Sequence, residues 1–224
     1  LLPNIRYFEF TGGEPFMIRE HFDLLKRAVE LGYSKNITIH YNTNGTLYPK
    51  NLTHIWQKFK RVEIALSIDN VGKRFEYERY PADWQQVNNN VRKFEQLKQD
   101  SGNIDLQLCF TVNVLNVLYL DQLLDWASTV DFNTYHWNML HGPEEMSIAC
   151  LPDSAKEKVI DQLQQQRFKP HHQQDVNNVI SMIENGTSSN GIDLLRKLSV
   201  TDRYRKQHLS QTHPELAQVL NYGN

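Results

Sequence analysis

The sequence predicts an α/β protein in which parallel strands alternate with helices. Short runs rich in Val, Ile, Phe and Tyr recur along the first 150 residues, and segments with apolar residues at helical spacing separate them. Strands joined through helices pair in parallel, with right-handed crossovers. This pattern does not distinguish a doubly wound sheet from a partial barrel. In either fold, the carboxyl ends of the strands form the ligand-binding edge.

Each predicted strand is a short apolar or alternating run. The five runs are residues 6–10, 36–41, 61–68, 104–114 and 134–140. Apolar residues at three- and four-residue spacing predict the helices between them, at residues 19–31, 49–60, 84–99 and 119–129. Gly32 follows the first of these helices, where a glycine commonly ends a helix.

From Leu151 the strand pattern gives way to helical periodicity. We predict helices at residues 153–166, 176–183 and 192–211, and a last helical turn at 214–220. Residues 184–191, which are rich in Gly, Ser and Asn, predict a flexible link. The chain is therefore predicted to contain an α/β domain at residues 1–150 and a helical C-terminal extension at 151–224.

The composition limits the function classes. A chain of 224 residues with 40% hydrophobic residues suits one large domain, or one domain with a small appendage. The net charge of −2 gives no electrostatic case for binding nucleic acid or an anionic membrane. No apolar run approaches the roughly 18 residues of a membrane span, and no signal peptide is visible. We predict a cytoplasmic protein without nucleic-acid or membrane partners.

The histidines and cysteines do not suggest a metal site. His171 and His172 are adjacent, so their side chains diverge, and surface positions are predicted for both. Cys109 lies in an apolar strand and is predicted to be a small core residue. Cys109 and Cys150 are too far apart to describe a disulfide framework.

Polar residues follow the first predicted strand in the sequence Thr11-Gly-Gly-Glu-Pro15. Gly12 and Gly13 have no Cβ, so a ligand can approach their backbone closely. Glu14 places a carboxylate at the same strand end, where it is suited to an ammonium group. Its structural alternative is to cap the helix that begins a few residues later.

Other polar residues occupy the ends of the next three strands or the segment after them, namely Asn44, Ser67, Asp69, Arg79, Thr111 and Asn113. Three of them have a specific structural alternative: Asn44 begins an Asn-Gly turn, Asp69 caps the following turn, and Arg79 pairs with a neighbour such as Glu76. Strand carboxyl ends meet at one edge of a parallel sheet, so these groups are predicted to form one ligand site.

Four segments carry a resemblance to a known superfamily: Thr11–Pro15, Ile37–Thr46, Val62–Asp69 and Phe75–Trp84. In their order and spacing, the chain resembles the radical S-adenosylmethionine (SAM) superfamily. It looks most like the twitch-domain radical SAM proteins carried by phages and marine bacteria. The resemblance covers residues 5 to about 150. It implies a partial (β/α)6 TIM-like barrel that lacks its first βα unit.

The resemblance also implies SAM as cofactor. Glu14 with the Gly12–Pro15 backbone would hold its ammonium group. Ser67 and Asp69 would lie near its carboxylate and ribose, and Arg79 would pair with its methionyl carboxylate. The remaining residues that would line the ligand are Asn44, Thr111 and Asn113. None of these residues is expected to transfer protons as a catalyst.

One departure from the superfamily concerns its [4Fe–4S] cluster, which Cys-x-x-x-Cys-x-x-Cys holds just before the strand that ends in Gly-Gly-Glu-Pro. This chain has only Cys109 and Cys150, both downstream, and neither can replace that triad. We therefore expect a fragment without its cluster-bearing first unit, with the cluster ligands upstream of Leu1. We expect no metal ligands and no radical chemistry in this chain alone.

The activity that the resemblance implies is that of a radical SAM enzyme. A reduced cluster, supplied with electrons by a flavodoxin or ferredoxin, cleaves SAM to a 5′-deoxyadenosyl radical, which abstracts hydrogen from substrate. The substrate is not identified, although relatives modify peptides among other compounds. Two alternatives stay open: a metal-independent barrel enzyme that uses Glu14 and Asp69 as acid and base, and a degenerate barrel that acts as a non-catalytic binding or scaffold protein.

Overall fold

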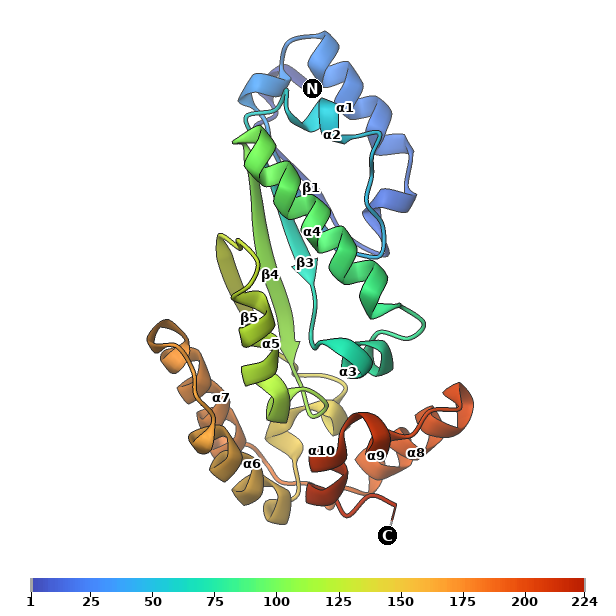
Figure 1. Cartoon of the computed structure of the whole chain (residues 1–224), viewed down its shortest axis with the longest axis vertical. Helices are drawn as coiled ribbons and strands as arrows, with labels where there is room; N and C mark the ends of the chain where they lie inside the picture. Colours follow the sequence, from blue (N-terminus) through green and yellow to red (C-terminus); the bar gives the residue numbers. More distant parts are fainter. Residues whose placement is uncertain (1, 224) are drawn as a thin grey trace. The chain divides into compact units, whose positions relative to one another are not determined.

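The computed structural model describes residues 2–223 and confirms the predicted α/β fold (Figure 1). Five strands form one sheet in the order β1-β2-β3-β4-β5, so neighbours in sequence are neighbours in the sheet. The first three pairs, from β1–β2 to β3–β4, are parallel. The strands are β1 (Tyr7–Phe10), β2 (Thr38–Thr43), β3 (Arg61–Ser67), β4 (Ile104–Val112) and β5 (Thr134–Met139). This arrangement is consistent with a partial TIM-like barrel.

Helices alternate with the strands and then form the C-terminal part of the chain. The helices of the strand region are α1 (Glu20–Glu30), α2 (Thr53–Trp56), α3 (Gly72–Glu78), α4 (Trp84–Ser101) and α5 (Leu120–Ala127). The C-terminal helices are α6 (Asp153–Gln165), α7 (Gln173–Asn185), α8 (Ile192–Arg205), α9 (Leu209–Thr212) and α10 (Pro214–Val219). Short 3₁₀ helices are η1 (Leu2–Asn4), η2 (Pro15–Met17), η3 (Ser34–Asn36), η4 (Val117–Tyr119), η5 (Glu144–Met146), η6 (Ile148–Cys150) and η7 (Pro170–His172). Within residues 2–223, no helix has the length and apolar character to cross a membrane.

The chain forms two compact units, each built from several segments. Unit 1 contains the chain up to Ile68 together with Ala82–Cys109 and Ala127–His136. Unit 2 contains Asp69–Pro81, Phe110–Trp126 and the chain from Trp137 onward. Strands β4 and β5 therefore each contribute residues to both units. The domain division predicted between residues 150 and 151 stays a prediction.

Aromatic rings fill the core of unit 1 beneath the turn that follows β1. Phe16 packs on Tyr41, Trp56 and Phe94, with ring centroids 5.0, 5.8 and 6.1 Å apart. All four side chains are buried. Phe16 lies two residues after Glu14, so this packing fixes the course of the chain at the predicted ligand edge.

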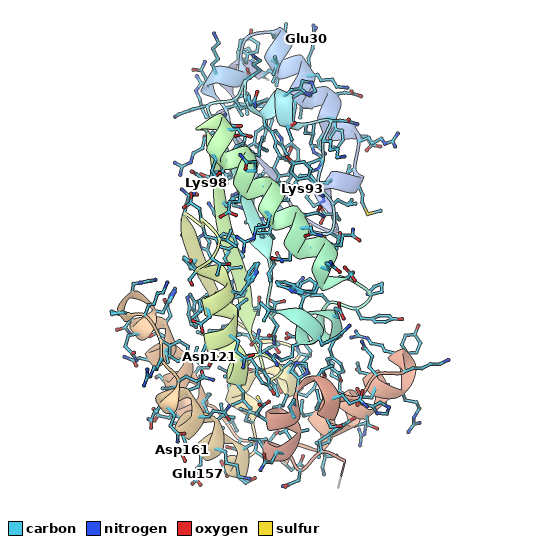
Figure 2. The ribbon with its side chains drawn as sticks, viewed as in Figure 1. Glu30, Lys93, Lys98, Asp121, Glu157 and Asp161 are labelled. Atoms are coloured by element: carbon cyan, nitrogen blue, oxygen red, sulfur yellow. The ribbon has the colours of Figure 1, made fainter. Side chains whose placement is uncertain are left out.

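Helix α4 also belongs to unit 1 and has the predicted apolar face. The Asp83 side chain caps its first turn by accepting a hydrogen bond from the Gln86 backbone N–H at 2.7 Å. Figure 2 labels two lysines of this helix, Lys93 and Lys98. The ammonium group of Lys98 pairs with Asp131 at 2.8 Å. The buried face consists of Val87, Asn90, Val91, Phe94 and Leu97.

The region between β2 and α4 differs from the predicted helices. Of residues 49–60, only α2 is α-helical, because the N–H groups of Lys58 and Phe59 bond carbonyls three residues back, as in 3₁₀ turns. The segment Phe75–Trp84 includes part of helix α3, for which no helix was predicted. Pro81 separates α3 from α4, since a proline cannot continue the backbone hydrogen-bond pattern of a helix.

The predicted helix at residues 192–211 is broken into α8 and α9. Lys206 ends α8 because its backbone adopts a left-handed conformation, with φ of 54°. The predicted flexible link at residues 184–191 is instead tied to the rest of unit 2. The Lys156 ammonium bonds the Gly186 carbonyl at 2.7 Å, and the Ser189 hydroxyl bonds the Cys150 carbonyl at 2.6 Å.

Candidate functional site

Glu14 is held by three hydrogen-bond donors at the end of β1. Its carboxylate accepts hydrogen bonds from the Thr43 hydroxyl at 2.9 Å, the Asn44 backbone N–H at 3.0 Å and the Phe16 backbone N–H at 3.2 Å. Glu14 is only 8% exposed. Burial raises the pKa of Glu14 above its usual value, although the three hydrogen bonds act in the opposite direction. The carboxylate thus links the ends of β1 and β2 directly.

The Gly12–Gly13 turn leaves backbone open beside this carboxylate. Both glycines have positive φ, 82° and 53°, and an added Cβ on either would meet nothing within 4 Å. Pro15 is buried and begins η2, which Glu14 caps through the Phe16 N–H. A carboxylate has about four lone-pair sites, so Glu14 can accept one further donor. The turn therefore fulfils the capping interpretation of Glu14 and leaves room for a cationic ligand.

Thr43 is a contact that the sequence analysis did not single out. Its hydroxyl donates to Glu14 and accepts the Gly45 backbone N–H at 3.1 Å, and the side chain is buried. Asn44 shows the predicted turn chemistry, because its Oδ1 accepts from the N–H and hydroxyl of Thr46 at 2.9 and 2.6 Å. The polar run Asn42-Thr43-Asn44 at the strand end was the available signal.

Ser67 is the last residue of β3 and also belongs to unit 1. It lies opposite Cys109 in the parallel register and is half-buried. Its predicted contact with a SAM carboxylate stays a prediction.

Asp69 and Arg79 form an ion pair in unit 2. The Arg79 Nε donates to Asp69 Oδ2 at 2.7 Å, and Nη2 contacts the same oxygen. Arg79 therefore does not pair with Glu76, whose carboxylate is bonded to Lys73 at 2.7 Å. The other Asp69 oxygen accepts the Thr111 backbone N–H at 2.8 Å. These bonds join the segments that flank α3 to the end of β4.

The Asp69 carboxylate is 7% exposed. Burial raises its pKa above the usual value and nearby Glu78 raises it further, whereas Arg79 lowers it. Asn116, which is 1% exposed, adds hydrogen bonds to the carbonyls of Asp69 at 3.1 Å and Thr111 at 2.9 Å. Asp69 and Thr111 are thus fixed through both side-chain and backbone groups.

Asn113 organises the turn after β4. Its Oδ1 accepts the Leu115 backbone N–H at 2.8 Å, and its Nδ2 donates to the Thr111 carbonyl at 3.0 Å. Glu78 and Asn116 also contact Asn113 and were not predicted from the sequence. The signal for Asn116 was its spacing of three from Asn113, because an Asn side chain commonly bonds backbone groups within a turn.

No metal centre is found among residues 2–223, where no group of three or more His, Cys, Asp or Glu could hold an ion. Two sequence predictions need correction. His172 is buried at 4% exposure because its ring packs against that of Trp137, with centroids 5.7 Å apart. Burial lowers the pKa of His172 to about 4. Cys109 is half-buried, because it lies on the less buried of the two alternating faces of β4.

The predicted site residues fall into two groups. Hydrogen bonds join Glu14 to Asn44 in unit 1, whose candidates are completed by Gly12, Gly13, Pro15 and Ser67. Unit 2 holds Asp69, Arg79, Thr111 and Asn113 in one connected network. In both units, the polar groups cluster at strand ends of an α/β fold of the partial-barrel class.

Comparison with known proteins finds solved structures that share this fold. Neither a protein-family model nor a curated protein matches the sequence. The solved structure "Native anSMEcpe with bound AdoMet" is 16% identical, with a TM-score of 0.50, and the match covers 87% of this chain and 52% of that one. "Native anSMEcpe with bound AdoMet and Kp18Cys peptide" is also 16% identical, with a TM-score of 0.50 and coverage of 77% and 48%.

The chain thus spans about half the length of these structures. At this level of identity, the similarity is one of fold.

Proposed function

We propose that this chain binds SAM (AdoMet) at its strand ends, as part of a radical SAM enzyme. The observation that carries the proposal is the open Gly12–Gly13 backbone next to the buried Glu14 carboxylate. The ammonium group of SAM requires hydrogen-bond acceptors and its carboxylate requires a cation. Its adenosine requires polar groups. The fold shared with AdoMet-bound structures adds support.

Glu14 would accept a charge-assisted hydrogen bond from the ammonium group of SAM. The Thr43 hydroxyl and the Asn44 N–H already fix the orientation of its carboxylate, so little side-chain freedom is lost on binding. The backbone of Gly12 and Gly13 would supply further acceptors, because no Cβ shields it.

Arg79 would bind the methionyl carboxylate of SAM. A guanidinium group has five N–H donors, and the contacts with Asp69 use only Nε and Nη2. The Asp69 oxygens already accept from Arg79 and Thr111, so we assign Asp69 the role of orienting Arg79. The proposal keeps Asn44, Ser67, Thr111 and Asn113 as residues that line the ligand.

Residues 2–223 do not fit a [4Fe–4S] cluster, since they contain no group of three possible ligands and only two cysteines. In the superfamily, such a cluster supplies the electron that cleaves the SAM sulfonium. The side chains of this chain account for SAM binding alone. We propose that a [4Fe–4S] cluster belongs to the intact enzyme, that a flavodoxin or ferredoxin supplies electrons, and that the substrate is a peptide, as the anSMEcpe complex with a Kp18Cys peptide suggests.

Calorimetric titration with SAM tests the binding proposal. The unmodified chain should bind SAM, and Glu14→Gln should bind it at least roughly tenfold more weakly, because a hydrogen bond to a charged group contributes about 1.5–3 kcal/mol. Glu9→Gln is the matched control, since Glu9 is exposed on β1. Equal affinity for Glu14→Gln and the unmodified chain would exclude Glu14 from the site. An absence of SAM binding by the unmodified chain would favour the scaffold alternative.

One observation favours the acid–base alternative: burial raises the pKa of both Glu14 and Asp69, as a general acid requires. Hydrolysis of a small ester or glycoside by the SAM-free chain, lost in both Glu14→Gln and Asp69→Asn, would support that reading. An inactive chain that binds SAM would reject it.

A further inference from the structure

Helix α3 connects Asp69 to Arg79, and it is too short to hold its own position. It has seven residues, whereas isolated helices below about 12–15 residues are marginal in water. Two of its side chains, Phe75 and Tyr77, are each 1% exposed. The placement of the Asp69–Arg79 pair therefore depends on what α3 packs against within unit 2.

Helix α8 holds α3 through Tyr77. The Tyr77 hydroxyl donates to Asp202 Oδ1 at 2.9 Å, and Arg205 Nη1 donates to the Tyr77 carbonyl at 2.7 Å. The Arg205 guanidinium also lies over the Tyr80 ring, 5.2 Å from its centroid. Burial and then the hydrogen bond to Asp202 raise the pKa of Tyr77, so its hydroxyl stays protonated as a donor.

The start of α10 contacts the same helix through His213. His213 is fully buried, and its ring packs edge-on against Tyr77 at 5.1 Å between centroids. Its Nε2 lies 3.9 Å from Glu78 Oε1, which accepts a hydrogen bond from Asn70 at 2.8 Å. Asn70 follows Asp69 directly, so this contact reaches the start of the α3 segment, while Tyr77 lies near its end.

Asp202 provides a matched comparison. It accepts hydrogen bonds from two tyrosine hydroxyls, Tyr77 and Tyr222, at 2.9 Å each, and from the Leu209 N–H at 2.9 Å. Only Tyr77 belongs to α3. Loss of the Tyr77 or the Tyr222 hydroxyl removes one tyrosine donor from the Asp202 carboxylate, but only loss of the Tyr77 hydroxyl is expected to loosen α3.

We propose that helices α8–α10 position the SAM-binding pair Asp69–Arg79, with Tyr77 and Asp202 as the principal positioning contact. The identity of the ligand rests on the proposed function. The positioning of α3 is a property of unit 2 that can be measured without ligand. The C-terminal helices thereby have a role in the binding site, although the predicted site residues all lie at or after the ends of strands.

Hydrogen exchange of the full chain tests this role in Tyr77→Phe and Tyr222→Phe. The reporters are the Arg79 N–H, which bonds the Phe75 carbonyl at 2.8 Å, and the Thr111 N–H, which bonds Asp69. Tyr77→Phe should speed exchange at both reporters about fivefold, the effect of one net hydrogen bond. Tyr222→Phe should leave both rates within about twofold of the unmodified chain. Equal acceleration in the two variants, or none in Tyr77→Phe, would overturn the proposal.

Titration with SAM separates this proposal from the proposed function. Affinity should fall about fivefold in Tyr77→Phe and stay unchanged in Tyr222→Phe. If the unmodified chain binds no SAM while the exchange rates differ as expected, the ligand assignment fails and the positioning of α3 stands. If SAM binds equally to both variants, the positioning role in binding is rejected while the SAM site stands.

Discussion

Replacing Glu14 with alanine should destabilise the folded chain as well as weaken binding of the proposed ligand. The substitution removes the common acceptor of three donors, the Thr43 hydroxyl and the N–H groups of Asn44 and Phe16. Each hydrogen bond contributes about 1 kcal/mol net, so the free energy of unfolding should fall by about 3 kcal/mol. The low exposure of Glu14, 8%, means that water cannot readily replace the lost acceptor.

Urea denaturation measures this loss, and exchange of the Asn44 N–H localises it to the end of β2. Thr43→Val should lower the free energy of unfolding by about 1–2 kcal/mol, and Thr43→Ser should restore most of it by keeping the hydroxyl. Glu9→Ala controls for the loss of an exposed carboxylate from the same strand. A Glu14→Ala variant within about 0.5 kcal/mol of the unmodified chain would refute the reasoning, because the three donors would then need no carboxylate.

Three further predictions concern pH, the ion pair and a close backbone approach. Since burial lowers the pKa of His172 to about 4 from 6.5, the folded chain binds this proton more weakly than the unfolded chain. The contribution of His172 to the free energy of unfolding should therefore not vary with pH above 6.5, and should fall by up to about 3 kcal/mol as the pH drops toward 4. His172→Phe should flatten this dependence of the free energy of unfolding on pH, and an unchanged dependence would contradict the assignment. Arg79→Lys should lower the free energy of unfolding by about 1–2 kcal/mol, and the urea midpoint with it, because an ammonium group cannot reproduce the planar contact with the buried Asp69. An unchanged midpoint and free energy would show that the planar geometry of this ion pair is unimportant. Gly186→Ala should lower the melting temperature, because its Cβ would lie 2.2 Å from a backbone carbonyl oxygen, whereas Gly142→Ala, with open space around it, should not; equal effects of the two would be inconsistent with the packing described.

The strands and the longest helix were predictable because their signals are local. Alternation and apolar runs located all five strands to within a few residues, and the apolar spacing located α4. Gly12 and Gly13 were identified from residue type, and their positive φ angles explain why glycine occupies both positions.

The partners of the site residues were not predictable, because they lie far away in sequence. Glu14 bonds Thr43, which is 29 residues distant, and Tyr77 bonds Asp202, 125 residues distant. The spacing of apolar residues indicates which face of a helix or strand is buried, but it does not indicate which residues of other elements pack against that face. The structural alternative for Arg79, an ion pair with Glu76, rested on proximity in sequence, whereas in the structure Arg79 pairs with the buried Asp69 carboxylate.

The discontinuous build of unit 2 has a consequence for how the chain matures. The segment Asp69–Pro81 enters this unit early in the sequence, yet Tyr77 finds its hydrogen-bond partners 125 and 128 residues later, at Asp202 and Arg205. Closing so long a loop carries an entropic cost, and contacts of high sequence separation form slowly. A ribosome synthesises the chain from its N-terminus, so unit 1 strands can pair while α3 still lacks its support. The Asp69–Arg79 pair therefore reaches its final position only after the last helices have been made, and the proposed ligand site is incomplete in a nascent chain until then.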